Sequence, residues 1–411
     1  MKYIIPSIFF SLSVMAGPLQ NVNKVTDNLE NYLIQNPTDS LVNVWVYFSD
    51  KNVIDLEGDL AEIKNSLSIR TKWRRHKARG DEIVDLRDIQ VAEGYINQVL
   101  AIGGKLRTKS RWLNAISVSV NPDVLQYLSE LHIVQNIDLV LSGHRLEVEM
   151  ATELNFQSNS NSRVEYGESF GQLDQINAIA AHDAGYRGQG VIVLILDTGF
   201  YKEHEAISDD RIIAEWDFVN NDGETQNEPG DPEAAHDHGT YIASTLGGMF
   251  DGQLYGPAYE SEFLLAKTED VYLEEPIEED WFVAGLEWGE LLGADVASSS
   301  LVFMDWLTFE ELDGETTVTT IAVTIAIENG MTVATAAGNN GENGIVAPAD
   351  AFDVITCGAV DISGQIAWFS SHGPTADGRI KPDVCAQGVD TYCANINGPS
   401  SYRVASGTSL S

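Results

Sequence analysis

The first 160 residues mix apolar and polar positions as a half-buried sheet requires. Residues 42–48 alternate between the two kinds of side chain, and residues 113–120 and 133–141 are also typical of strands. Residues 56–67 and 121–131 predict helices, the second of which starts with an Asn cap. This order of elements predicts a small α+β domain.

The pattern changes beyond residue 164, where short, fully apolar segments alternate with helical ones. Such segments are typical of strands that are buried on both faces of a sheet, with helices between them. We therefore predict a parallel α/β sheet, with chemistry at the carboxyl ends of its strands. The predicted strands are residues 191–196, 263–266, 295–300 and 331–337, and the predicted helices are residues 279–293 and 319–330.

Charge divides the 411-residue chain at the same place. Residues 1–163 contain 17 Lys and Arg against 19 Asp and Glu, whereas residues 164–411 contain 7 against 43. So acidic a second part argues against nucleic acid as a partner. The basic run at residues 70–82 is typical of a solvated helix face, but the acidic second part is also available to bind it.

The N-terminus has the pattern of a secretory signal peptide. Lys2 precedes an apolar run and then small residues, which predicts cleavage near Ala16, at the end of residues 1–16. We therefore expect a protein that is secreted or held at the cell surface. No apolar stretch of about 20 residues follows, so no membrane-spanning helix is predicted. Residues 144–164 are polar and aperiodic, which predicts a linker that a protease can cut.

The chain contains three cysteines. In an oxidising compartment Cys385 and Cys393 could form a disulfide across a short turn, although spacing alone does not fix the pairing. Cys357 is expected to be a buried thiol in a strand.

Asp197 comes directly after an apolar segment, in the sequence Asp-Thr-Gly, which predicts a carboxylate at the carboxyl end of a strand. Asp-Thr-Gly also occurs in aspartic proteases. Those need a second such motif, because two carboxylates must share one proton. The sequence contains no second Asp-Thr-Gly, so that interpretation is excluded.

Three more side chains could take part in chemistry. His238 precedes Gly-Thr and a predicted helix, so we expect it in the first helical turn, whereas His236 is expected to be a solvated loop residue. Asn339 follows a predicted strand and could donate to an oxyanion, although turn asparagines are common in Asn-Asn-Gly sequences. Ser409 follows Gly-Thr where a helix could begin, with backbone N–H groups for an oxyanion. A serine nucleophile needs a base, and an imidazole base needs a carboxylate to hold its tautomer, which Asp197 can supply.

In this order and with these motifs, residues 165–411 resemble the subtilisin-like serine proteases, also called subtilases or S8 peptidases. The resemblance rests on Asp-Thr-Gly, His-Gly-Thr, Ala-Ala-Gly-Asn and Gly-Thr-Ser. It implies an endopeptidase in which Ser409 attacks the peptide bond, His238 transfers the proton and Asp197 orients His238. Asn339 and the N–H of Ser409 would stabilise the oxyanion, and no cofactor is implied for catalysis.

The same resemblance implies a subtilisin-like α/β fold for the second part and identifies residues 20–143 as a propeptide of ferredoxin-like fold. Such a propeptide inhibits the enzyme, assists its folding and is cut off, here within residues 144–164. Because the two parts differ in charge, Arg74 and Arg75 are predicted to help dock the propeptide on the acidic catalytic domain.

By the family pattern, two segments would form opposite walls of the primary specificity pocket and bind protein or peptide substrates. The family usually has Gly where Val302 stands, so this β-branched side chain is expected to narrow the pocket. The predicted substrate-binding residues are Ser300, Leu301, Val302, Ala337 and Gly338.

Members of the family often bind calcium, and the oxygen-rich residues 217–225 are a candidate site, although acidic loops are often merely solvated. Two alternatives stay open: a sedolisin, which shares the fold but uses Glu and Asp instead of His, and an inactive subtilase-fold binding module. His238 and Asn339 argue against the first, and the complete set of catalytic residues argues against the second. Because the family continues past the nucleophile, we also expect the natural protein to extend beyond Ser411.

Overall fold

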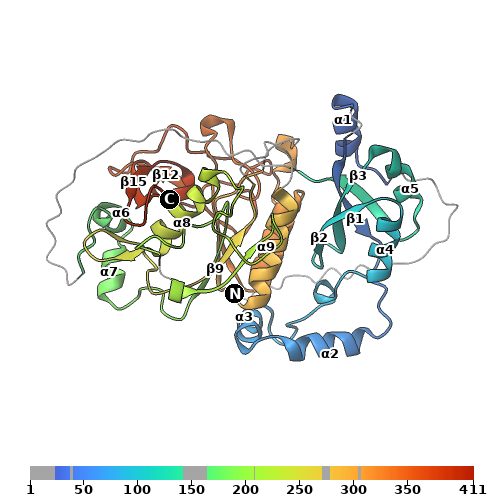
Figure 1. The fold of residues 1–411 in the computed structure, drawn as a ribbon, viewed down its shortest axis with the longest axis horizontal. Helices are drawn as coiled ribbons and strands as arrows, with labels where there is room; N and C mark the ends of the chain where they lie inside the picture. Colours follow the sequence, from blue (N-terminus) through green and yellow to red (C-terminus); the bar gives the residue numbers. More distant parts are fainter. Residues whose placement is uncertain (1–23, 38–39, 142–163, 208, 271–277, 304–306) are drawn as a thin grey trace.

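The computed structural model describes residues 24–37, 40–141, 164–207, 209–270, 278–303 and 307–411. The predicted signal peptide and nearly all of the predicted linker lie outside these residues. Two units lie side by side, the N-terminal one in blue to cyan and the C-terminal one in green to red (Figure 1). No helix of the described residues is long and apolar enough to cross a membrane.

The N-terminal unit contains a four-stranded antiparallel sheet with the order β2-β3-β1-β4. The first strand lies in the centre, because β1 pairs with both β3 and β4. This order is the ferredoxin-like one, so the α+β prediction is confirmed. The strands are β1 (Val42–Phe48), β2 (Lys105–Ser110), β3 (Ala115–Val120) and β4 (Val134–Leu139). The helices are α1 (Asp27–Gln35), α2 (Leu56–Ser66), α3 (Ile69–Arg79), α4 (Glu93–Ala101) and α5 (Leu125–Glu130).

Alternation along β1 gives this sheet two buried faces. Val44 and Val46 pack in one core with Ile96 of α4 and Leu128 of α5. Trp45 points to the opposite face and belongs to the core of the C-terminal unit. The sheet is therefore covered by its own helices on one side and by the second unit on the other.

The C-terminal unit contains a seven-stranded sheet with the order β13-β12-β11-β10-β5-β9-β6, in which every pair is parallel. This confirms the predicted parallel α/β sheet. The strands are β5 (Ile192–Asp197), β6 (Ile212–Asp217), β9 (Glu262–Lys267), β10 (Val296–Ser299), β11 (Thr332–Ala336), β12 (Ile355–Val360) and β13 (Val384–Gln387). Two small hairpin-like sheets pair β7 (Met249–Phe250) with β8 (Leu254–Tyr255), and β14 (Thr391–Ala394) with β15 (Tyr402–Ala405).

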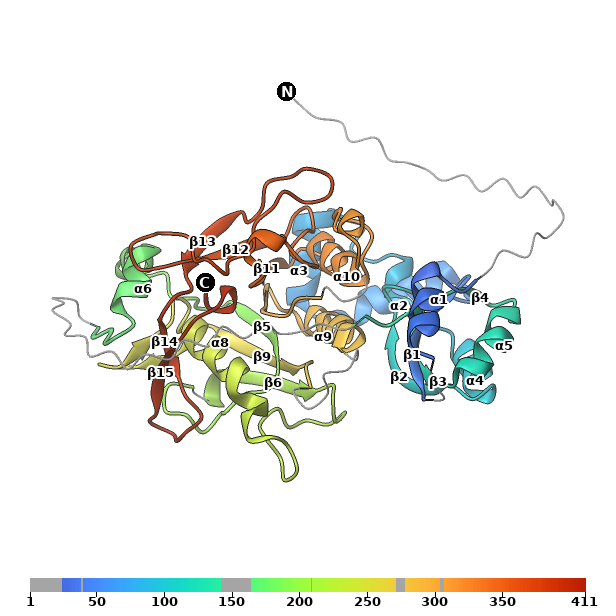
Figure 2. The ribbon, with the colours of Figure 1, turned by 90° about the horizontal axis from the view of Figure 1, so that it is seen from above.

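Helices cover both faces of the seven-stranded sheet, as Figure 2 also shows. Along β5, Val193 and Ile195 pack in a core with α8, whereas Leu194 and Leu196 pack in another with α9 and α10. Residues 192–196 of β5 are all apolar for this reason. The helices are α6 (Phe170–Gln175), α7 (Ala178–Asp183), α8 (Asp237–Gly247), α9 (Glu278–Leu292) and α10 (Val318–Glu328). Short 3₁₀ helices are η1 (Leu86–Asp88), η2 (Pro122–Val124), η3 (Asp209–Arg211), η4 (Glu233–His236), η5 (Phe309–Glu311), η6 (Gly341–Asn343) and η7 (Thr408–Leu410).

The cysteine prediction is wrong, because all three thiols are free. Cys385 is exposed on β13, at the edge of the large sheet, whereas Cys393 is buried on β14, which belongs to a different sheet. The turn between them therefore leads from one sheet to another instead of closing a hairpin. Cys357 on β12 is partly exposed rather than fully buried.

Candidate active site

Asp197 and His238 meet at the carboxyl end of β5. Asp197 is the last residue of β5, and His238 lies in the first turn of α8, as predicted. His238 Nδ1 lies 2.7 Å from Asp197 Oδ1, which also accepts a hydrogen bond of 2.8 Å from the N–H of Thr198. Asp197 is fully buried and His238 is 5% exposed. The carboxylate therefore holds the imidazole in a site that is nearly closed to water.

Glycine lets the two motifs approach each other. A side chain at Gly239 would collide with the carbonyl oxygen of Gly199, and one at Gly199, whose φ is 141°, would lie 2.8 Å from the carbonyl oxygen of Thr225. The glycines of Asp-Thr-Gly and His-Gly-Thr are thus needed to bring the carboxylate to the imidazole.

His236 is buried, so the prediction of a solvated residue is wrong. Its Nδ1 accepts a hydrogen bond of 3.3 Å from the N–H of Asn227, and its ring lies near that of Tyr201. Burial lowers the pKa of His236, because desolvation disfavours the charged form. The burial of His236 could not be predicted from the sequence, because it depends on η4, which directs the ring inward just before α8 begins.

Asn339 lies against the turn that carries Ser409. Its Oδ1 accepts hydrogen bonds from Thr408, 3.0 Å from the N–H and 2.9 Å from the hydroxyl. A methyl group at Gly407 would lie 3.6 Å from Asn339 Nδ2 and 3.8 Å from the backbone nitrogen of Ser409. The carboxamide oxygen of Asn339 is therefore occupied. Its N–H₂ group and the N–H of Ser409 both lie beside Gly407.

Ser409 lies in η7, which packs against α8, β11 and β12. The residue is partly exposed, and its carbonyl oxygen accepts a hydrogen bond of 3.2 Å from the Ser300 hydroxyl. In the described part of the chain, the Ser409 hydroxyl makes no hydrogen bond to His238. Catalytic hydrogen bonds are often long without substrate and tighten when it binds.

The predicted pocket residues follow two neighbouring strands. Ser300, Leu301 and Val302 come after β10, and Ala337 and Gly338 come after β11, with which β10 pairs in parallel. Leu301 and Ala337 are buried, whereas Ser300 and Val302 are partly exposed. The fold therefore brings the two segments to one edge of the sheet.

In the candidate calcium loop, a lysine side chain of the protein already pairs with Asp217. Asp217 accepts hydrogen bonds from the N–H groups of Val219 (2.7 Å) and Asn220 (2.8 Å), and its carboxylate lies 2.8 Å from Lys267 Nζ. Among the described residues, no group of three His, Cys, Asp or Glu side chains is arranged to hold a metal ion.

Four carboxylates of α9 face the N-terminal unit, and the sequence did not single them out. Glu279 accepts from Trp45 Nε1 at 2.7 Å, and Asp280 pairs with Arg107 at 2.9 Å. Glu287 accepts from the hydroxyl of Ser110 at 2.5 Å. The fourth, Glu290, meets Arg74, Arg75 and Arg111. The available signal was acidic residues spaced along one side of the helix predicted at residues 279–293.

The pKa values of three of these carboxyl groups shift in different directions. Burial raises the pKa of Glu279 well above its usual range and also raises that of Glu287. Burial acts in the same direction on Glu290, but the guanidinium groups outweigh it and hold the pKa of Glu290 below its usual value. The arginines therefore favour the charged form of Glu290, whereas burial disfavours the charged forms of Glu279 and Glu287.

Comparison with known proteins gives a family for each unit. Residues 188–411 match the subtilase family (Peptidase S8), and residues 43–160 match the Peptidase S8 propeptide domain of Bacteroidota. Serine protease AprX of Bacillus subtilis is 28% identical over an alignment of 317 residues, which covers 72% of this chain and 64% of that protein. Subtilisin-like protease 1 of Pseudogymnoascus destructans is 29% identical over 236 residues, 55% of this chain and 50% of that protein.

Subtilisin E of Bacillus subtilis is 27% identical over 313 residues, 75% of this chain and 70% of that protein. The chain spans less than two thirds of the length of AprX and of the fungal relative. The subtilase match alone covers more than half of this chain. The chain therefore belongs to the subtilase family, with an S8 propeptide domain before the catalytic part.

Proposed function

We propose that the chain is the precursor of an exported serine endopeptidase that uses Asp197, His238 and Ser409. The proposal rests on the buried 2.7 Å contact between His238 Nδ1 and Asp197 Oδ1, beside the turn that carries Ser409. When Nδ1 donates to the carboxylate, the neutral ring keeps its lone pair on Nε2. Nε2 is then the base for the serine hydroxyl.

In the proposed reaction, Ser409 Oγ attacks the carbonyl carbon of the scissile bond while its proton passes to His238 Nε2. The imidazolium then protonates the leaving amine, the C–N bond breaks, and water releases the peptide from the acyl-enzyme. Asn339 Nδ2 and the N–H of Ser409 are the proposed donors to the oxyanion, because they flank the same glycine.

We propose that the substrate lies between residues 300–302 and 337–338. These backbone segments end neighbouring parallel strands beside the Ser409 turn. The side chain of Val302 is the proposed reason for a narrow pocket, so that small side chains are preferred before the scissile bond.

We further propose that the N-terminal unit inhibits the enzyme and assists its folding, as expected of an S8 propeptide domain. Trp45 and Trp112 belong to the same buried cluster as Phe282 and Leu286 of α9, so the two units share a hydrophobic core. Export, through the predicted signal peptide, belongs to the same proposal.

A structural calcium ion at residues 217–225 also stays a proposal. Lys267 already neutralises part of the charge of Asp217 there. If a chelator leaves the thermal stability of the protein unchanged, residues 217–225 do not hold a structural calcium ion.

The proposed activity is tested by hydrolysis of a peptide library by the natural full-length protein. The Ser409→Ala variant should lose hydrolysis, whereas Ser411→Ala, a change two residues away in the same turn, should keep it. Hydrolysis by Ser409→Ala at the wild-type rate would reject the serine mechanism. Maximal hydrolysis only at strongly acid pH would favour the sedolisin type instead.

A further inference from the structure

Helix α3 of the propeptide lies across the carboxyl ends of two catalytic-domain helices, α9 and α10. Arg74 Nε donates to the carbonyl oxygen of Asn329 (3.1 Å), just after α10, and Arg74 Nη2 donates to that of Glu290 (3.0 Å) in α9. Arg74 Nη1 donates to the carbonyl oxygen of Ala294. One guanidinium therefore serves the ends of both helices.

These carbonyl groups lie in the last turn of α9, at Glu290, or just beyond the ends of α9 and α10, at Ala294 and Asn329. The last four carbonyls of a helix have no partner within it, and the carboxyl end carries a partial negative charge. α9 and α10 contain no basic residue in their last turns, so the helices do not supply a cation of their own. The arginines of α3 supply it from the other unit.

Two glycines admit α3 to this position. Gly293 and Gly330 follow α9 and α10 with φ of 99° and 85°. A methyl group at Gly330 would lie 2.7 Å from the carbonyl oxygen of Arg74, and one at Gly293 would lie 3.3 Å from Arg70 Cδ. The helix ends are thus shaped for close contact with α3.

The carboxylate of Glu290 completes the arrangement. It is fully buried and receives Arg75 at 2.8 Å (Nε to Oε1) and 2.7 Å (Nη2 to Oε2), and Arg111 at 3.2 Å. Arg74 also pairs with it. Arg74 and Arg75 are 3% and 0% exposed, so these pairs are shielded from salt and water.

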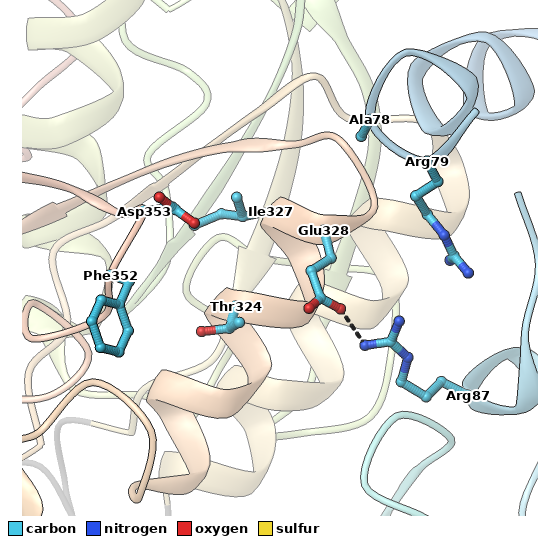
Figure 3. A pocket seen from close by; sticks show the side chains of 8 residues that line it. All are labelled: Ala78, Arg79, Arg87, Thr324, Ile327, Glu328, Phe352 and Asp353. Carbon is cyan, nitrogen blue, oxygen red and sulfur yellow. Dashed lines mark hydrogen bonds and ion pairs between the residues drawn. The ribbon is translucent and has the colours of Figure 1, made fainter. Parts of the chain in front are cut away.

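A neighbouring ion pair between the units is exposed to solvent instead of buried. Arg87 and Glu328 form an ion pair of 2.5 Å with side chains that are 33% and 51% exposed. The pair lines a cavity of about 460 Å³ between α3 and α10 (Figure 3). The interface is open there, and exposed pairs of this kind contribute little to stability.

We propose that Glu290 and the carboxyl ends of α9 and α10 form a guanidinium-binding site, which Arg74 and Arg75 fill in the precursor. Filling it caps both helices while the catalytic domain folds, so α3 is a docking element of the propeptide that is separate from the proposed active site. The inference rests on the proposed folding role of the propeptide, and it names the residues that perform that role.

The site requires the planar fork of arginine, not only its charge. Arg74 uses all three of its nitrogens on different acceptors, whereas a lysine ammonium is one point at the end of a flexible chain. Arg74→Lys therefore separates a built guanidinium site from general attraction between a basic helix and an acidic domain.

The test uses urea unfolding of the natural full-length precursor in a Ser409→Ala background, in which self-cleavage cannot occur. We expect Arg74→Gln to lower the folding equilibrium constant about 100-fold or more and Arg74→Lys to lower it at least about tenfold. Glu328→Gln, the control at the exposed pair, should change it less than about fivefold. Arg74→Lys equal to the parent, or Arg74→Gln equal to Glu328→Gln, would overturn the proposal.

If the Arg74 variants do not fold, refolding yield replaces the unfolding curve. Arg74→Ala is refolded with methylguanidinium or with methylammonium at the same millimolar concentration. Methylguanidinium should raise the yield and methylammonium should not, whereas equal yields would contradict the site. These readouts need no catalysis, so loss of the proposed serine mechanism would not affect them.

Discussion

Asp197 and Glu290 are both buried carboxylates with a buried basic partner, yet they are held in different ways. Asp197 contacts one imidazole, and both residues belong to the catalytic domain, 41 positions apart. Glu290 contacts three guanidinium groups that all come from the propeptide, up to 216 positions away. The first pair stays complete when the propeptide leaves, and the second is broken.

The difference separates the proposed catalysis from the proposed docking. A carboxylate that orients a base needs one directional partner in a closed site. A carboxylate that holds another unit gains from several charge-assisted hydrogen bonds, and it becomes an unpaired group once the unit is gone. Variants at the two positions should therefore affect different measurements.

The largest effect is expected at the first carboxylate. Asp197→Asn should lower kcat for peptide hydrolysis about 10⁴-fold, because the amide no longer holds His238 in the tautomer that accepts a proton. Steady-state kinetics of the matured enzyme measures it, with Asp361→Asn, in a surface turn, as the control. A loss of less than about tenfold would show that Asp197 does not orient the base.

The second carboxylate should affect stability instead. Glu290→Ala leaves buried arginines without their partner, so the precursor should lose about 3–5 kcal/mol of its free energy of unfolding. Urea unfolding in the Ser409→Ala background measures the loss, and Glu328→Ala, at the exposed pair, should cost at most about 1 kcal/mol. Equal costs for the two variants would remove the distinction between the buried and the exposed contact.

Asn339 gives a smaller catalytic effect than Asp197. Asn339→Ala should lower kcat about 100- to 1,000-fold with little change in KM, because the carboxamide is proposed to bind the oxyanion only in the transition state. Asn340→Ala is the control in the same turn. An effect on KM alone would place Asn339 in substrate binding.

The smallest effect is a pH dependence of the contact between the units. Docking buries Glu279 and Glu287 and raises their pKa, so their contribution is complete below the ordinary carboxyl pKa and is lost as pH rises through the raised values. Glu290, with its lowered pKa, contributes in the opposite sense, above the ordinary value. As pH rises from the ordinary carboxyl range towards neutrality the precursor should therefore lose stability, by at most about 1.4 kcal/mol per pH unit for each proton.

Unfolding curves of the Ser409→Ala precursor across this pH range measure the dependence. Glu279→Gln should flatten the curve, because a neutral amide takes up no proton. A steeper curve in that variant, or stability that rises over this range, would contradict the assignment.

Much of the fold was readable from the sequence, because periodicity reports burial. The apolar segment before Asp197 and the alternation in residues 42–48 correspond to β5 and β1. The inward turn of His236 and the separation of Cys385 from Cys393 were not readable, since both depend on contacts made only in three dimensions. Glu290 was missed for the same reason: its partners lie far away in the chain.

The location of a covalent adduct shows whether Ser409 is the nucleophile. The natural full-length protein is treated with a fluorophosphonate, digested and sequenced by mass spectrometry. We expect one adduct, on Ser409, that is absent from Ser409→Ala and strongly reduced in Asp197→Asn. An adduct on Ser406 or Ser411, or labelling that survives in Ser409→Ala, would contradict this assignment.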